Sequence, residues 1–440
     1  MRGKRVRKEA FCLVLFIAVF GLVAAGLLMQ APLALAKENK IRLLGVLSMT
    51  GPAAFYGVGV DKGVKLALKE IEARGIKGFS GVEWRVIDTE TKPSTTERKL
   101  KRELPLFKPH VAPMVGTESE LRVLCVNMPK EKVPAPVGGH LGMNKYMGEG
   151  SVPVSQWIMY YGFADYFIGQ IAGEFFHKKG AKKVALIAGD YDWGYSNGMG
   201  LKRYWEKNGH PFEIVAVIYT PLDKTDYSTE VQIIKDLKPD AIFSPFCGAG
   251  WWSLGKQLKE GGAFPEILLH CVGYSSLGSA KLSGEFGAEG VYAVNDHDPT
   301  SQVWADFIKR WKAEYGEQAY PEPYAENYYE LTGWIIKALE EVGPDKINDK
   351  DYVADTMLKT SYQNILVSPM GPLCPYGSNW GAKAAVVQYV KGSSPIDPSF
   401  GLHGEVREII ATPKMDIKQI LEEMGAMTRL EPGEKYPMGQ

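Results

Sequence analysis

The stretch IRLLGVLSMTGPAAFYGVGVDKGVKLALKEI, residues 41–71, holds an apolar run, a turn of small residues and a helical repeat in direct succession. Ile41 to Leu47 is apolar enough for a buried strand, and Thr50-Gly51-Pro52 forms the turn. Apolar residues then recur every three or four positions, at Val60, Val64, Ala67, Leu68 and Ile71. This order predicts a strand followed by a helix, the repeating unit of a parallel sheet covered by helices.

The same unit recurs along the chain in two series. The first continues with strands predicted over residues 82–88 and 111–115 and a helix over 95–106. The second, after Ser151, is predicted as helix 161–178, strand 183–189, helix 199–208, strand 213–219, helix 227–237, strand 241–244, helix 251–261 and strand 267–271. Since ordinary domains hold about 100 to 200 residues, we expect an α/β protein of two lobes.

The first 36 residues resemble an export signal. Five Lys or Arg precede an uncharged stretch at residues 11–29, and Ala34-Leu35-Ala36 is a small-residue cleavage site. We therefore expect a mature chain that begins near Lys37 and is exported to the periplasm. An uncleaved anchor is the alternative, because the apolar stretch approaches the ~20 residues that cross a bilayer.

Charge and cysteine content exclude some classes of function. The signal segment holds five of the 51 Lys and Arg and one of the 51 Asp and Glu, so the mature chain has four more acidic than basic residues. This balance argues against a nucleic-acid surface. Four cysteines remain, in no zinc-ligand spacing. A Cys247–Cys271 disulfide is the first expectation, because each residue closes a predicted strand, and buried thiols are the alternative.

The predicted strand ends carry Gly-rich segments with aromatic residues. In open parallel sheets, ligands bind outside the carboxyl ends of the strands. The segments are 48–57, 116–120, 135–142, 189–196, 245–252 and 272–276, and their aromatic residues are Tyr56, Trp193, Phe246, Trp251, Trp252 and Tyr274. The set predicts a small-molecule cleft with apolar walls. Trp251 and Trp252 are also explained as core residues of a helix.

Three motifs that suggest other chemistry are weak. Gly194-Tyr-Ser196-Asn-Gly198 matches a hydrolase nucleophile elbow, but the preceding strand ends too early, so we expect Ser196 to begin a helix. Asp296-His297-Asp298 suggests a metal site, yet adjacent residues share no face and no partner histidine lies at ligand spacing, so a solvated loop is expected. No G-x-G-x-x-G is present. We therefore expect no enzyme activity, no cofactor and no metal.

Longer stretches together resemble one known family. They are residues 41–71, VEWRVIDTETKPS, KEKVPAPV, AKKVALIAGDYDWGYSNG, YSTEVQIIKDLKPDAIFSPFCGAG, FGAEGVYAV and the helical block from Ala305 to Gly343. In this order, over most of residues 41–391, they resemble the type I periplasmic binding proteins, the leucine/isoleucine/valine-binding family. The resemblance implies a bilobed monomeric receptor with three hinge crossings that closes on a solute and delivers it to the permease subunits of an ABC importer.

The resemblance also implies the lobes and the site. Lobe 1 is expected over 37–153 and 293–365, lobe 2 over 154–292 and 366–391, and a C-terminal extension over 392–440. The implied ligand-binding residues are Tyr56, Thr117, Glu118, Ser119, Gly139, His140, Trp193, Phe246, Cys247, Tyr274 and Tyr329. Of these, Tyr56 and Trp193 are expected to clamp the ligand from opposite lobes. His140 could donate to a carboxylate, or be an exposed loop histidine.

The sequence departs from the family's amino-acid binders in two places. Pro136 to His140 lacks their hydroxyl residues, and Val272 stands where they carry the acid that pairs with the ligand ammonium. Since an unpaired buried ammonium is costly, Glu118 or Glu330 would have to replace that acid. Two ligand classes stay open, aliphatic amino acids and carboxylates or amides without an α-ammonium. An extracellular sensor without a permease is the alternative function.

Overall fold

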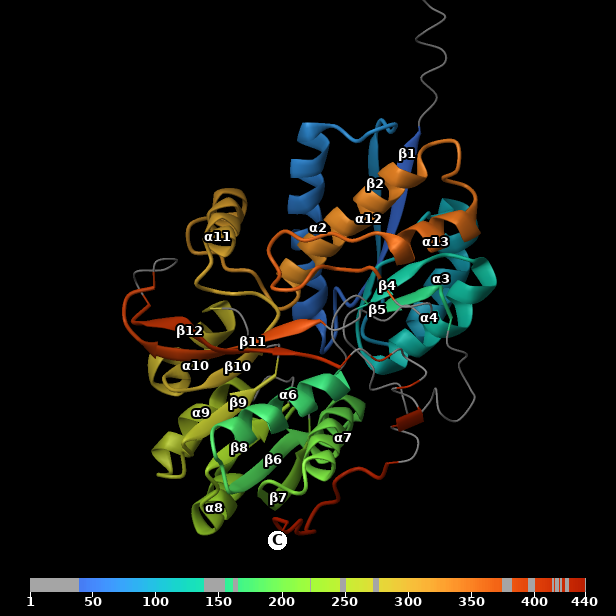
Figure 1. The fold of residues 1–440 in the computed structure, drawn as a ribbon. Coiled ribbons are helices and arrows are strands. Elements are labelled where there is room, and N and C mark those ends of the chain that lie inside the picture. The colour runs from blue at the N-terminus through green and yellow to red at the C-terminus, as the bar shows by residue number, and fades with distance from the viewer. Residues whose placement is uncertain are drawn as a thin grey trace, which may run out of the picture.

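The computed structural model folds into two lobes joined by passages of chain, shown one above the other in Figure 1. The structure describes residues 39–137, 155–160, 165–221, 223–245, 251–271, 277–373, 382–394, 400–413, 415, 419, 422–423 and 427–439. The predicted α/β class with two lobes is confirmed. The predicted signal segment lies outside the described residues. Within them, no helix is both long and apolar enough to cross a membrane.

The first lobe holds a five-stranded sheet in the order β2-β1-β3-β4-β5, with all described pairings parallel. Its strands are β1 (Lys40–Leu47), β2 (Gly81–Asp88), β3 (Met114–Val115), β4 (Ala135–Val137) and β5 (Ile158–Tyr160). The helices of this lobe are α2 (Ala54–Arg74), α3 (Pro93–Phe107), α4 (Glu118–Glu131), α11 (Gln302–Tyr315), α12 (Ala325–Val342) and α13 (Lys350–Lys359). Their apolar faces form one buried core with the sheet.

The second lobe holds a seven-stranded sheet in the order β12-β11-β10-β9-β8-β6-β7, in which β11 pairs antiparallel with both neighbours. Its strands are β6 (Lys183–Gly189), β7 (Glu213–Thr220), β8 (Ala241–Ser244), β9 (Ile267–His270), β10 (Tyr292–Asn295), β11 (Lys383–Lys391) and β12 (Leu402–Ala411). Its helices are α6 (Asp165–Lys178), α7 (Asp192–Lys207), α8 (Ser228–Leu237), α9 (Trp251–Glu260) and α10 (Leu277–Ala288). They enclose a second, separate core.

The strand pairing moves the passages between lobes relative to the expected boundaries. β5 lies in the first sheet and β10 in the second, so the chain crosses after residue 160 and again after residue 295. The third passage lies between Leu373, packed in the first core, and β11. The segment expected as a C-terminal extension contributes β12 to the second sheet. Pairing with a distant strand leaves no local mark in the sequence, which explains the difference.

Helix α7 also begins seven residues earlier than its predicted start at Met199. Its first half is rich in glycine, which lowers helix propensity. In the structure these glycines let α6 and α7 approach closely, because a Cβ on Gly200 would lie 1.9 Å from the carbonyl oxygen of Tyr166. Tertiary packing therefore overrides the local preference for a loop.

Candidate functional site

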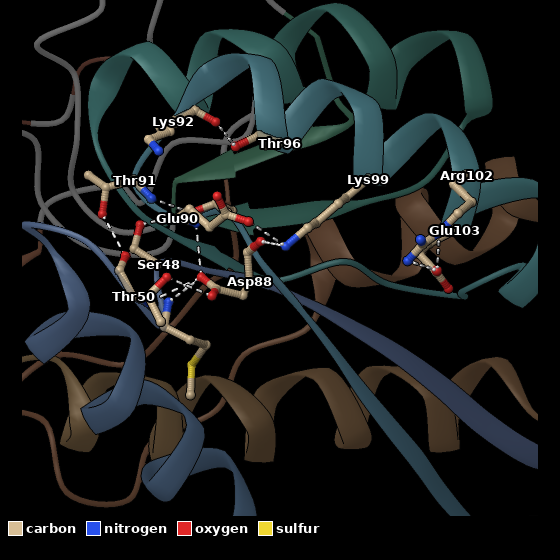
Figure 2. A network of polar contacts seen from close by, with 12 residues as sticks. Ser48, Thr50, Asp88, Glu90, Thr91, Lys92, Thr96, Lys99, Arg102 and Glu103 are labelled. Atoms are coloured by element: carbon tan, nitrogen blue, oxygen red, sulfur yellow. Dashed lines mark hydrogen bonds and ion pairs between the residues drawn. The ribbon is translucent and has the colours of Figure 1, made fainter.

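The carboxyl ends of β1 and β2 are joined by a network centred on Asp88, shown in Figure 2. Its Oδ1 accepts hydrogen bonds from the backbone N–H groups of Met49, Thr50 and Glu90, at 3.0, 3.1 and 2.9 Å. Its Oδ2 accepts the Thr50 hydroxyl at 2.8 Å. Partial burial raises the pKa of Asp88, but these donors outweigh it and the net pKa lies below the usual value. The charged carboxylate thus holds the turn that leads into α2.

The turn packs tightly against its own strand. A Cβ on Gly57, in the first turn of α2, would lie 2.2 Å from the carbonyl oxygen of Ser48. The Ser48 hydroxyl is buried and lies 3.2 Å from Oε1 of Glu120 on α4. Glu120 in turn accepts the Thr117 N–H and hydroxyl, each at 2.8 Å. The small side chains in the segment 48–57 therefore allow β1, α2 and α4 to pack closely.

Aromatic residues from the two lobes meet beside this strand end. Phe55 on α2 contacts Trp252 on α9 edge to face, with ring centroids 6.1 Å apart. Tyr56 instead lies 5.2 Å from Tyr324, within the first lobe. Phe55, one position before the expected Tyr56, is thus a residue of α2 that reaches the second lobe. The large aromatic side chain of Phe55, beside Tyr56 in the sequence, was the signal that could have indicated this contact.

An interlobe pocket of ≈ 340 Å³ lies at this contact. The first lobe supplies Phe55 and the loop between α11 and α12, and the second supplies residues of α9 and α10. Its lining residues are Phe55, Trp252, Gly278, Lys281, Leu282, Gln318, Tyr320, Pro321, Glu322 and Pro323. The pocket therefore changes shape with any movement between the lobes.

The pocket carries one cation and one paired carboxylate. The Lys281 ammonium lies 4.7 Å from the ring centroid of Tyr320. Glu322 forms an ion pair with Lys62 of α2. Lys281 is the basic residue that lines the pocket, and it comes from the second lobe. Lys281 and Tyr320 stand in segments without a Gly-rich strand end, so the sequence pattern did not indicate them.

Two expected binding residues, Trp193 and Tyr329, contact other residues of their own lobes. Trp193 is 2% exposed and packs in the second core, because α7 begins at Asp192 and makes it a helix residue. The Tyr329 hydroxyl donates to Glu70, at 2.5 Å, and accepts from Arg310. Glu70 lies near the far end of α2 from the turn. Their contacts with a ligand therefore stay predictions.

The remaining residues expected at the site are either placed by the structure or lie outside its described part. Glu330 is buried and accepts the N–H groups of Asn364 and Ile365, so its carboxylate serves the first lobe instead of a ligand. Burial raises the pKa of Glu330 to about 7. Ser119 is exposed beside the start of α4. Outside the described residues lie Gly139, His140, Phe246, Cys247, Tyr274 and the side chain of Glu118. The Cys247–Cys271 pairing stays a prediction.

The two rejected motifs also look different in the structure. Ser196 does not begin a helix but lies inside α7, where it is 2% exposed. The expected solvated loop at residues 296–298 is wrong for His297, which is completely buried. It lies with Asp296 against Glu326, at the start of α12.

Two α/β lobes that share a pocket and are joined by passages of chain define the class of bilobed binding proteins. A family model described as a periplasmic binding protein matches residues 40–392. The chain belongs to this family of periplasmic binding proteins, as its sequence pattern predicts. No curated protein matches the chain.

Several solved structures share the fold. A solute-binding protein of an ABC transporter from R. palustris in complex with benzoate is 17% identical, with 86% of this chain and 98% of that chain covered and a TM-score of 0.70. One from Rhodopseudomonas palustris BisB5, in complex with 3,4-dihydroxybenzoic acid, is 21% identical over 87% and 99%, with a TM-score of 0.69. The leucine-binding protein LivK from Thermotoga maritima is 19% identical over 84% and 98%, with a TM-score of 0.65.

Proposed function

We propose that this protein is a periplasmic solute-binding protein that captures a small molecule between its lobes and delivers it to an ABC-type importer. The family, the predicted export signal and the interlobe pocket support this role. Ligand binding would shift an open–closed equilibrium through contacts made better in the closed form. The protein acts by binding without catalysis, and the burial of Ser196 inside a helix is consistent with that.

The proposed ligand is a carboxylate with an apolar or aromatic body and no α-ammonium. The observation that carries this proposal is the pairing of aromatic walls, Phe55, Trp252 and Tyr320, with the Lys281 cation in one interlobe pocket. Aromatic faces suit a flat apolar body, and an ammonium group suits a carboxylate. Of the three similar structures, two hold benzoates, whereas LivK represents amino-acid binding.

Calorimetric titration of the purified protein with benzoate, 4-hydroxybenzoate, leucine and isoleucine tests the proposal. We expect a benzoate to bind and the amino acids to bind much more weakly. Lys281→Gln should weaken benzoate binding about 10- to 100-fold, the value of a charged hydrogen bond. Trp252→Ala should weaken it roughly tenfold or more, because it removes a large apolar wall.

Lys256→Gln is the matched control, since Lys256 lies on the same helix as Trp252 and its side chain is 54% exposed beside Glu260. This variant should bind like the wild type. Binding of leucine without benzoate would overturn the ligand class and favour the amino-acid hypothesis. If Lys281→Gln binds benzoate with unchanged affinity, this pocket is not the binding site.

A further inference from the structure

We propose that Asp296, His297 and Glu326 form a binding site for a divalent transition-metal ion, such as Zn²⁺, at a passage between the lobes. Each residue offers one ligand atom, and these atoms lie within 4.8 Å of one another. Ligands around a tetrahedral zinc ion lie about 3.5 Å apart, so inward movement of about 1 Å is sufficient. One imidazole and two carboxylates are a donor set that suits Zn²⁺ or Mn²⁺.

Burial of an unmatched imidazole is the independent observation behind the proposal. The His297 side chain is 0% exposed. Among the residues that the structure describes, neither of its ring nitrogens has a hydrogen-bond partner, and Oδ1 of Asp296 has none either. His297 Nδ1 lies 3.5 Å from that oxygen. Since a buried polar group without a partner destabilises the folded state, a metal ion between these atoms would remove that cost.

Neighbouring groups hold the proposed ligands in place. The His297 ring stacks on Trp304 of α11, with centroids 3.6 Å apart and planes 14° apart. The side-chain amide of Asn327 donates to Oδ2 of Asp296, which leaves Oδ1 for the metal. Outer partners of this kind orient metal ligands and tune their affinity. The backbone is fixed as well, because the N–H of Val367 donates to the carbonyl of Asp296 at 2.8 Å.

The location gives the ion a structural consequence. Asp296 and His297 directly follow β10 of the second sheet, whereas Glu326 lies in the first turn of α12, in the first lobe. A bound ion would therefore fasten the passage between the lobes to the first lobe. No local spacing in the sequence indicates this site, because its third ligand, Glu326, comes from a helix later in the chain.

Isothermal titration of the chelator-treated protein with ZnCl₂ tests the site, with Co²⁺ absorption to report the coordination. We expect one ion per chain, a visible d–d band and a raised melting temperature, because an ion that binds only the folded state stabilises it. His297→Gln and Glu326→Gln should lose more affinity than the roughly 10- to 100-fold typical of an outer partner. Asn327→Ala should fall within that 10- to 100-fold range.

His403→Gln is the matched control, because His403 lies 3.2 Å from Glu405 as a second His–Glu pair, on β12. It should bind Zn²⁺ like the wild type. No stoichiometric binding by the wild type would overturn the proposal. So would unchanged binding by both His297→Gln and Glu326→Gln, since the ion would then be held elsewhere. Circular dichroism tests whether each variant is folded. If His297→Gln does not fold, the Zn²⁺ affinity of Asn327→Ala tests the site instead, and an unchanged affinity would overturn the proposal.

Discussion

His110 shows how one buried side chain links stability to pH. It is 8% exposed, and its Nδ1 accepts the backbone N–H of Arg42 at 3.0 Å. Burial lowers the pKa of His110 from 6.5 to about 4, and the nearby Arg42 charge adds to the effect. The imidazole is therefore neutral in the folded protein at pH 7, while an unfolded chain takes up a proton below pH 6.5.

We expect the free energy of unfolding to fall by about 3 kcal/mol through this residue as the pH drops from 6.5 to 4. The folded pKa is depressed, so the unfolded state gains protons first and is favoured by acid. His110→Asn keeps an acceptor near the Arg42 N–H and removes the titration. Urea denaturation at several pH values gives the free energy of unfolding as a function of pH. Between pH 6.5 and 4 this free energy should fall less steeply for His110→Asn than for the wild type or for His403→Asn. If the free energy of unfolding depends on pH equally in all three proteins, His110 is not the residue that links stability to pH.

Glycine residues allow the close packing of helices α6 and α7. A Cβ on Gly169 of α6 would lie 1.9 Å from the carbonyl oxygen of Asn197, and one on Gly200 equally close to that of Tyr166. Both obstacles are backbone atoms, which cannot rotate away. The helices must therefore separate if either residue gains a side chain.

Gly200→Ala should destabilise the protein by about 1–3 kcal/mol or more, in the range of overpacked cores. Gly198→Ala in the same helix is the control. Its Cβ would meet only side-chain atoms, Leu186 Cδ2 at 3.1 Å and the Tyr219 hydroxyl at 3.3 Å. The gain in helix propensity, about 0.5–1 kcal/mol, offsets part of that contact. Denaturant titration that finds the two variants equally stable would refute the packing argument.

The C-terminal segment of the chain completes the second lobe. Tyr436 pairs with Ile214 on the edge strand β7, through hydrogen bonds of 2.8 and 3.2 Å. Leu430 is completely buried, and its carbonyl accepts the Tyr219 hydroxyl at 3.0 Å. Figure 1 shows the end of the chain beside β7. Covering an edge strand protects it from pairing with other chains.

Leu430→Ala should cost about 2–5 kcal/mol, as other buried leucine truncations do. Met438→Ala is the control from the same segment, because Met438 is 47% exposed and surface changes usually stay within about 0.5 kcal/mol. Guanidinium denaturation followed by circular dichroism measures both. A Leu430→Ala protein as stable as the control would mean that the segment does not contribute to the lobe.

Much of the fold could be predicted from local patterns. The strands at 183–189 and 241–244 have the predicted bounds, and four others differ by one residue at one end. The strand predicted over 111–115 is shorter, because only Met114–Val115 pairs as β3. Strands β4, β5, β10, β11 and β12 and helix α10 were not among the predicted elements. β12 depends on pairing with β11, and α10 contains the non-helical Gly284. For the site, the strand-end pattern indicated the segment at residues 48–57, and the structure places its Phe55 in the interlobe pocket. Periodicity does not say which of two neighbouring residues faces another lobe, and the role of Tyr56 stays a prediction.

The sequence alone was sufficient for most of the strands and helices, the two-lobed α/β class and the family, because apolar periodicity and turn residues act within one element. The packing of the folded chain was needed to show that Phe55 contacts Trp252, that Trp193 is buried in the core, and that His297 lies beside Glu326. These contacts join residues far apart in the chain. They depend on how whole elements rotate and pack against one another, which no local pattern records.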